Sequence, residues 1–186
     1  FGGHPGERGW LGNTKLGTWE LDPATLKFRH LGDVGPGGQT QGVYDSANKL
    51  IVAVPARKGE GEKAPTITWV FSPATGKWEE RQSTASPRPG PAPSLVYDSK
   101  AKQCVYYTEY GETWLYDAAK NGWQDAKPPA SPPVRRHAGM CFDEKRGVTV
   151  LHGGMTHIRK DKDGDKPWAG WGESSRGFTG YGKFHN

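Results

Sequence analysis

The sequence predicts an all-β protein of short strands and tight turns, and two observations support this class. The 186 residues include 27 Gly and 15 Pro, both of which disfavour helix interiors. Aromatic residues still make up 11% of the chain, with eight Trp, whereas a disordered chain is poor in such rings. The length is sufficient for one domain with a hydrophobic core. No ten-residue stretch shows the 3.6-residue periodicity of an amphipathic helix.

Three strand–turn–strand units each begin with a Thr-Trp pair. In each unit a second aromatic residue follows the Trp by nine positions. The pairs are Trp19 and Phe28, Trp69 and Trp78, and Trp114 and Trp123. Turn-forming residues such as Pro73 and Gly76 lie between the two aromatics. We therefore expect three hairpins, in which the three Thr-Trp tryptophans occupy equivalent, mostly buried strand positions.

A second kind of hairpin begins with an aromatic-Asp pair and continues, after a polar turn, into an apolar run. The pairs are Tyr44-Asp45, Tyr97-Asp98 and Phe142-Asp143, and the runs are 50–54, 104–107 and 148–151. The last run leads into Gly153-Gly154, which matches the Phe1-Gly2-Gly3 at the start of the chain. Cys104 and Cys141 lie inside these strand segments without the CxxC spacing of a zinc site. We expect both to be buried free thiols.

The period of these units resembles that of a kelch repeat. Four short strands every 45 to 50 residues or so are typical of a β-propeller blade. The order aromatic-Asp, apolar strand, Gly-Gly, Thr-Trp, turn and second aromatic is similar to the kelch pattern over roughly residues 1–155. Arg135-Arg136-His137 is similar to the Arg and His often found before the first kelch strand. Val54-Pro55 and Thr108-Glu109 depart from the pattern, because they replace the Gly-Gly pair.

The resemblance implies kelch-type β-propeller blades along residues 1–186. We expect the second hairpin of a blade at about 17–32 and complete blades at about 38–82 and 90–127. The first hairpin of another blade follows at about 135–154, and a long loop or tail covers 155–186. About three blade-equivalents are too few for a ring of roughly four to eight blades. We therefore expect a segment of a larger propeller; the alternative is that several chains complete one ring.

Long connections between the second and third strands of the blades contain residues that the repeat does not explain. These residues are Trp10, Arg57, Lys58, Trp168 and Trp171. Equivalent loops of successive blades emerge on one face of a propeller, and Trp and Arg are frequent binding hot spots. We expect them to form one rim that binds a protein or carbohydrate partner, unless the aromatics pin the loops to the blade edges.

An acidic run suggests a calcium site. Asp161, Asp163 and Asp165 alternate with lysines around Gly164, and alternate carboxylates suit a hard cation. The glycine occupies the fourth position of the run rather than the sixth, as it would in an EF-hand loop. An ordinary polar loop is therefore the alternative to calcium.

The charge pattern limits the other partners. The net charge of +5 comes from 25 basic and 20 acidic residues that are mixed along the chain, whereas nucleic-acid-binding proteins gather basic residues on one element. No apolar run approaches the roughly 20 residues of a membrane span. We therefore expect no nucleic-acid partner and no membrane span. The compartment is left open, although a secreted or periplasmic location is favoured.

The sequence thus favours a non-catalytic propeller that serves as a binding or scaffold module, with no catalytic residue assigned. The alternative is an oxidoreductase similar to galactose oxidase, with a site partly outside this segment. In that family a copper site needs two Tyr and two His, with a Cys bonded to one Tyr. The chain contains no Tyr-His dipeptide.

Overall fold

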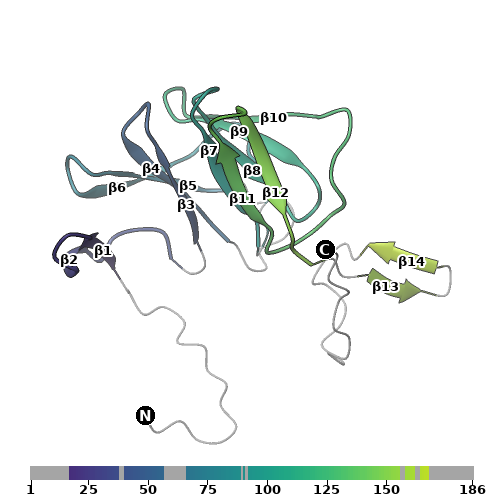
Figure 1. The fold of residues 1–186 in the computed structure, drawn as a ribbon, viewed down its shortest axis with the longest axis horizontal. Helices are drawn as coiled ribbons and strands as arrows, with labels where there is room; N and C mark the ends of the chain where they lie inside the picture. Colours follow the sequence, from purple (N-terminus) through teal and green to yellow (C-terminus); the bar gives the residue numbers. More distant parts are fainter. Residues whose placement is uncertain are drawn as a thin grey trace, which may run out of the picture.

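The described part of the chain consists of strands, turns and loops. The structure, a computed structural model, describes residues 17–37, 40–56, 66–88, 90, 92–155, 158–161 and 164–167. It gives the backbone alone for the last two ranges. These residues contain no helix (Figure 1), which confirms the all-β class. Accordingly, the described residues include no helix of the length and apolarity that a membrane crossing requires.

Fourteen strands are present within these ranges. The first six are β1 (Thr18–Asp22), β2 (Lys27–Gly32), β3 (Thr40–Asp45), β4 (Leu50–Pro55), β5 (Thr68–Ser72) and β6 (Lys77–Arg81). The next four are β7 (Ser94–Asp98), β8 (Gln103–Tyr107), β9 (Thr113–Asp117) and β10 (Gly122–Asp125). The last four are β11 (Gly139–Asp143), β12 (Val148–His152), β13 (Ile158–Asp161) and β14 (Gly164–Pro167).

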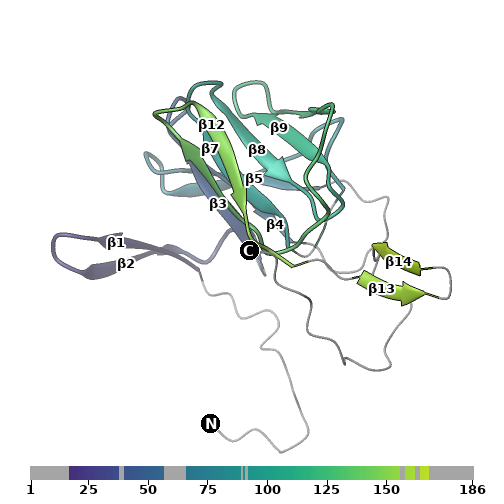
Figure 2. The ribbon, with the colours of Figure 1, turned by 45° about the vertical axis from the view of Figure 1, so that its right-hand side comes forward.

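The strands form two complete antiparallel sheets and three separate hairpins. The first sheet has the order β3-β4-β5-β6, and the second has the order β7-β8-β9-β10. Strands β1 and β2, β11 and β12, and β13 and β14 each form a two-stranded sheet. Strand β7 contacts both β3 and β11, so that the first strands of successive units lie side by side (Figures 1 and 2). The second sheet therefore has the first sheet on one face and the β11–β12 hairpin on the other, whereas the β1–β2 hairpin adjoins the first sheet.

The turns explain why the predicted strand–turn–strand units fold as hairpins. An Asp side chain at the end of the first strand accepts hydrogen bonds from the backbone of the turn. Asp45 Oδ1, for example, accepts from the Ala47 and Asn48 amides at 3.0 Å each. The residue before the second strand has a positive φ, as Lys49 (59°) and Asn121 (51°) show. The hydrogen bonds to the Asp side chain and the residue with a positive φ fix the loop length, and the loop length fixes the register of each hairpin.

The hydrophobic core lies between the two complete sheets. Val52, Val54 and Val70 of the first sheet pack with Cys104 and Tyr116 of the second. Trp123 of β10 is 6% exposed, and its ring lies 4.8 Å from that of Tyr116 and 5.5 Å from that of Tyr106. The second aromatic residue of the Thr-Trp unit is therefore the largest ring at this interface.

A repeated hydrogen bond joins successive units. Trp123 Nε1 on β10 donates to Thr68 Oγ1 on β5 at 2.9 Å. One unit earlier, Trp78 Nε1 on β6 donates to Thr18 Oγ1 on β1 at 2.7 Å. Both acceptors are the Thr of a Thr-Trp pair and the first residue of their strand. The Thr side chain therefore faces the following sheet, and the Trp next to it faces the preceding one, because side chains alternate along a strand.

The structure confirms that the three Thr-Trp tryptophans are equivalent, and the prediction that they are mostly buried is correct for Trp69 and Trp114 but wrong for Trp19. Each is the second residue of its strand. Trp69 and Trp114 are half-buried, and Trp19 is 56% exposed. Trp19 and its neighbour Leu21 point away from the first sheet, toward a side on which no described sheet lies. Among the described residues no sheet packs on this side, which accounts for their exposure.

The prediction of two buried thiols is half correct. Cys104 is fully buried, whereas Cys141 on β11 is exposed. Val96 is the equivalent residue of β7, and β11 covers it there. Cys141 has no such cover, because no further sheet of the described residues packs on that face of β11.

Thiol labelling should separate the two cysteines. Burial raises the pKa of the Cys104 thiol well above its usual range, and the nearby Asp45 carboxylate raises it further. Since the thiolate is the reactive form, a disulfide reagent at neutral pH should modify Cys141 at once and Cys104 only after urea unfolding. Mass spectrometry after proteolysis identifies the labelled cysteine. Equal rates for both in the native protein would contradict the described core.

A double-mutant cycle should measure the hydrogen bond between the sheets. Trp123→Phe leaves the buried Thr68 hydroxyl without its donor, and Thr68→Val removes the acceptor. We expect each to lower the free energy of unfolding by about 1–3 kcal/mol. The double variant should lose about 1 kcal/mol less than the sum. Urea denaturation measures these values, and strict additivity would show that the two side chains are not coupled.

Candidate binding cleft

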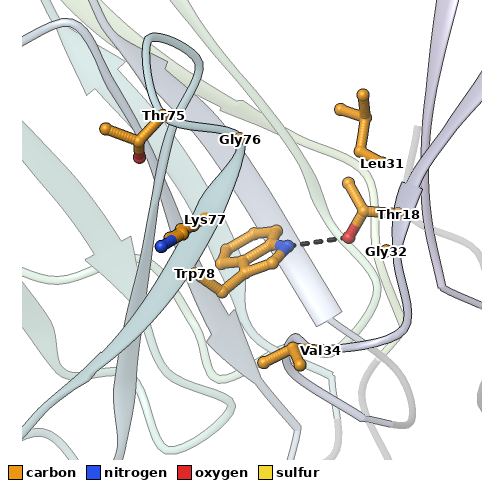
Figure 3. A pocket seen from close by; sticks show the side chains of 8 residues that line it. All are labelled: Thr18, Leu31, Gly32, Val34, Thr75, Gly76, Lys77 and Trp78. Atoms are coloured by element: carbon orange, nitrogen blue, oxygen red, sulfur yellow. Dashed lines mark hydrogen bonds between the residues drawn. The ribbon is translucent and has the colours of Figure 1, made fainter.

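The described structure has an open cleft between the hairpin β1–β2 and the outer hairpin of the first sheet, β5–β6 (Figure 3). Its volume is about 520 Å³. The lining residues from the first hairpin and its following loop are Thr18, Leu31, Gly32 and Val34; those from the second are Thr75, Gly76, Lys77 and Trp78. The two sets face each other across the interface that the Trp78–Thr18 hydrogen bond holds together.

Packing on three sides positions the Trp78 indole in this cleft. The Phe71 ring of β5 lies 5.2 Å from it within the same sheet, and Thr18 accepts from its Nε1 atom. On the loop after β2, a Cβ atom at Gly35 would lie 3.1 Å from Trp78 Nε1. The chain can therefore pass this close to the indole at a glycine, whereas a larger residue would displace the ring.

The cleft is open because two polar contacts of the next interface are missing from it. Between the two complete sheets, Arg81 Nη1 donates to the Ala118 carbonyl at 2.9 Å. Asn121 Nδ2 donates to the Gln82 carbonyl at 2.8 Å. We call these two contacts the clasp. It closes the rim of the interface around Trp123.

The repeat shows which residues replace the clasp in the preceding interface. Arg81 is the fifth residue of β6 and pairs with Thr68. The fifth residue of β2 is Leu31, which lies at a bulge beside Gly32, the residue that pairs with Thr18. Asn121 directly precedes β10, and the residue that directly precedes β6 is Gly76. Neither replacement carries a side-chain donor. The indole–threonine bond is therefore kept while the rim beside it stays open.

The lining of the cleft suits binding. It offers the faces of an indole ring and two aliphatic side chains, the hydroxyls of Thr18 and Thr75, and the Lys77 ammonium group. An indole face stacks on apolar or sugar surfaces, and hydroxyl and ammonium groups orient polar ones. The lining residues include no carboxylate and no imidazole, so they provide no general acid–base pair.

A buried ion pair stabilises a different region, where the β8–β9 connection meets the segment before β11. Arg136 Nε lies 2.5 Å from Glu109 Oε2, and the two side chains are 10% and 2% exposed. Glu109 stands where the following unit has Gly154, the second glycine of the Gly-Gly pair. The departure from the repeat at Glu109 thus supplies the partner of Arg136.

Further charged and aromatic groups surround this ion pair. The Arg88 guanidinium carbon lies 4.4 Å from the centre of the Tyr110 ring. Burial raises the pKa of the Tyr110 hydroxyl, and the Glu109 carboxylate adds to this shift. Glu112 Oε2 accepts from Trp114 Nε1 at 3.3 Å. The groups hold together the loops at this end of the second sheet, and we treat them as structural.

The binding and calcium residues predicted from the sequence remain untested. Trp10, Arg57, Lys58, Trp168, Trp171 and Asp163 lie outside the described residues. Asp161 and Asp165 lie on different strands of the β13–β14 hairpin, where Asp161 pairs with Gly164 and Asp165 with Lys160. In the described ranges, no three His, Cys, Asp or Glu residues form a group that could hold a metal ion. The rim and the calcium site therefore stay predictions.

Sequence reasoning missed the cleft. Its residues are ordinary for a hairpin, and Trp78 is a regular member of the repeat. The signal was the loss of Arg at Leu31 and of Asn at Gly76, which an alignment of the repeats displays. What the clasp residues contact, however, is visible in the structure alone.

Comparisons with known proteins give no family for the chain. No protein-family model matches it, and no curated protein matches it.

The buried ion pair predicts a large loss of stability when it is broken on one side. Glu109→Gln leaves the Arg136 guanidinium buried without a countercharge, and we expect a loss of about 3–5 kcal/mol in the free energy of unfolding. Glu20→Gln is the matched control, because its ion pair with Arg29 is exposed on the surface; its cost should stay below about 1 kcal/mol. Similar losses for both variants in urea denaturation would contradict this assignment.

Proposed function

We propose that the chain is part of a kelch-like β-propeller and acts as a non-catalytic module that binds a protein or a carbohydrate. Two four-stranded antiparallel sheets with the same strand order support the propeller. The adjacency of β3, β7 and β11 supports it further, since the first strands of propeller blades gather around one axis. The hydrogen bond between an outer-strand indole and the threonine of the preceding unit recurs at both interfaces.

The open cleft at Trp78 is the single observation that carries the binding role. The clasp residues of the other interface are replaced there, and the result is a hollow of about 520 Å³ with an aromatic wall. Rigid sheets on either side hold this wall in place, so that binding would require little reorganisation. A short sugar chain or an extended peptide segment fits the combination of indole, hydroxyl and ammonium groups.

One arrangement favours the oxidoreductase as a second candidate. Cys104 on β8 pairs directly with Tyr97 on β7 and with Tyr116 on β9. A Cys beside two Tyr is the pairing that a thioether of a copper radical site requires; the C–S bond replaces the thiol S–H and one ring C–H bond, and dioxygen would take up the two hydrogen atoms. Mass spectrometry would detect the cross-link as the loss of two hydrogen atoms from the Cys104 peptide and its Tyr partner. Metal analysis of the purified protein would report whether copper accompanies it.

Restoring the clasp should close the cleft. In the double variant Leu31→Arg and Gly76→Asn, we expect the introduced guanidinium and amide to donate to backbone carbonyls across the cleft, as Arg81 and Asn121 do in the next interface. Asn suits position 76, because the φ there is +65° and Asn tolerates this left-handed region. We expect the free energy of unfolding to rise by about 1–2 kcal/mol. Glycans and peptides selected on the wild-type chain, from an array and a displayed peptide library, should no longer bind.

The control for this variant is Leu26→Arg, which adds the same charge to the same hairpin. Leu26 is 76% exposed in the β1–β2 turn and does not line the cleft. Calorimetric titration of the selected ligands should give unchanged affinity for this control. Equal binding to the double variant and the wild type, or no selected ligand at all, would contradict the binding role of the cleft.

A further inference from the structure

Among the described residues, no strand pairs with the outer edge of β12, whereas in each complete sheet a third strand pairs with the equivalent edge. In both complete sheets, the second strand pairs with a third strand that begins with Thr-Trp. Strand β12 is the second strand of its unit, yet within the described ranges it pairs with β11 alone. The β13–β14 hairpin lies apart from β12 in both views of the ribbon (Figures 1 and 2). Unpaired backbone groups along such an edge are a template for another strand.

A polar atom on β12 also lacks a partner. Thr149 Oγ1 is buried and has no hydrogen-bond partner among the described residues. Thr149 is the second residue of β12, and Cys104 is the second residue of β8. Cys104 pairs across to Tyr116 on the third strand. The orphan hydroxyl therefore stands at the position that the missing third strand would cover.

Thr113 is the third member of the acceptor series. Thr18, Thr68 and Thr113 are each the first residue of their strand, and the first two accept an indole hydrogen bond from the following unit. Thr113 is half-buried and is equivalent to Thr68, so its hydroxyl faces the unit that begins with β11. No side chain of the described residues donates to it in the structure. A donor on the outer strand of that unit would complete the series.

We infer that the β12 edge and Thr113 together form a docking surface for a Thr-Trp β-hairpin that carries a Trp on its outer strand. The inner strand of this hairpin adds to β12, and the outer-strand indole donates to Thr113 Oγ1. The register follows from the second sheet, where Tyr106 pairs with Trp114. The equivalent residue of β12 is Leu151, which should lie opposite the Trp of the incoming Thr-Trp pair. The inference rests on the proposed propeller arrangement.

The chemistry of the occupant excludes the β1–β2 hairpin of a second copy. Its outer strand carries Phe28 at the position of Trp78 and Trp123, and a phenyl ring has no N–H to donate. The β13–β14 hairpin contains no Thr-Trp pair. An incoming hairpin with both Thr-Trp and the outer Trp satisfies the edge and the acceptor at once.

The test uses a cyclised peptide with the sequence of residues 112–126, which contains β9 and β10, as the incoming hairpin. A second peptide carries the Trp123→Phe change, and the protein is used as wild type and as Thr113→Val. Fluorescence anisotropy of a labelled peptide gives the four dissociation constants. We expect each single change to weaken binding about fivefold, and the two together to weaken it little further. Far-UV circular dichroism and protection of Cys104 from labelling show that Thr113→Val is folded.

A third peptide tests the addition of a strand. It is N-methylated at the amides that β9 uses to pair with β8, so it keeps the side chains but cannot pair with β12. We expect it not to bind. The inference is overturned if no peptide binds, if the N-methylated peptide binds as well as the parent, or if the Trp and Phe peptides bind equally.

A measurement of self-association tests the alternative in which a second copy of the chain occupies the β12 edge. Sedimentation equilibrium that shows dimers of the chain, which Leu21→Asp on β1 disrupts, would place a second copy at the edge and overturn the inference. None of these measurements involves the Trp78 cleft. A failed peptide experiment therefore leaves the ligand-binding test of the proposed function unaffected, and the reverse also holds.

Discussion

The hydrogen bond from an outer-strand indole to the threonine of the preceding unit is the interaction on which the arrangement depends. A buried Trp needs a partner for its N–H, and the Thr of the preceding unit's Thr-Trp pair provides one. Because neighbouring side chains of a strand point to opposite faces, the Thr of each pair meets the following unit and the Trp faces the preceding one. A single dipeptide thus specifies both neighbours of a sheet, which explains why it recurs at the start of β1, β5 and β9.

Because each sheet can be covered by a neighbour on either face, the burial of its side chains depends on how many neighbours it has. The second sheet has a neighbour on each face, and it contains the fully buried Cys104 and Tyr116. Within the described ranges one sheet packs on the β1–β2 hairpin, and Trp19, Leu21 and Phe28 on its other face are 56%, 44% and 66% exposed. Apolar side chains gathered on one face usually mark a surface that another element covers.

The sequence predicted the local structure well and the neighbours poorly. Hairpins could be predicted because the Asp that accepts turn amides and the left-handed residue before the second strand are properties of four or five adjacent residues. The equivalence of Trp69 and Trp114 followed from spacing. The exposure of Trp19 and Cys141 did not, since it depends on whether a sheet covers that face. The cleft was also missed: Leu31 and Gly76 are 45 positions apart, and their relation to Arg81 and Asn121 is a property of packing.

The cleft shows how a repeated fold can open a hollow between two units at small cost in stability. The two clasp hydrogen bonds contribute about 1 kcal/mol each, whereas a buried Trp contributes about 3–5 kcal/mol through its packing. Replacing Arg and Asn at the positions of Leu31 and Gly76 therefore removes the weaker contacts and keeps the indole–threonine bond. The interface stays closed at Thr18 and opens beside it. Since the wall of the hollow is the same Trp that joins the units, any ligand seated there would contact the residue that holds the two hairpins together, and its binding would stabilise that interface.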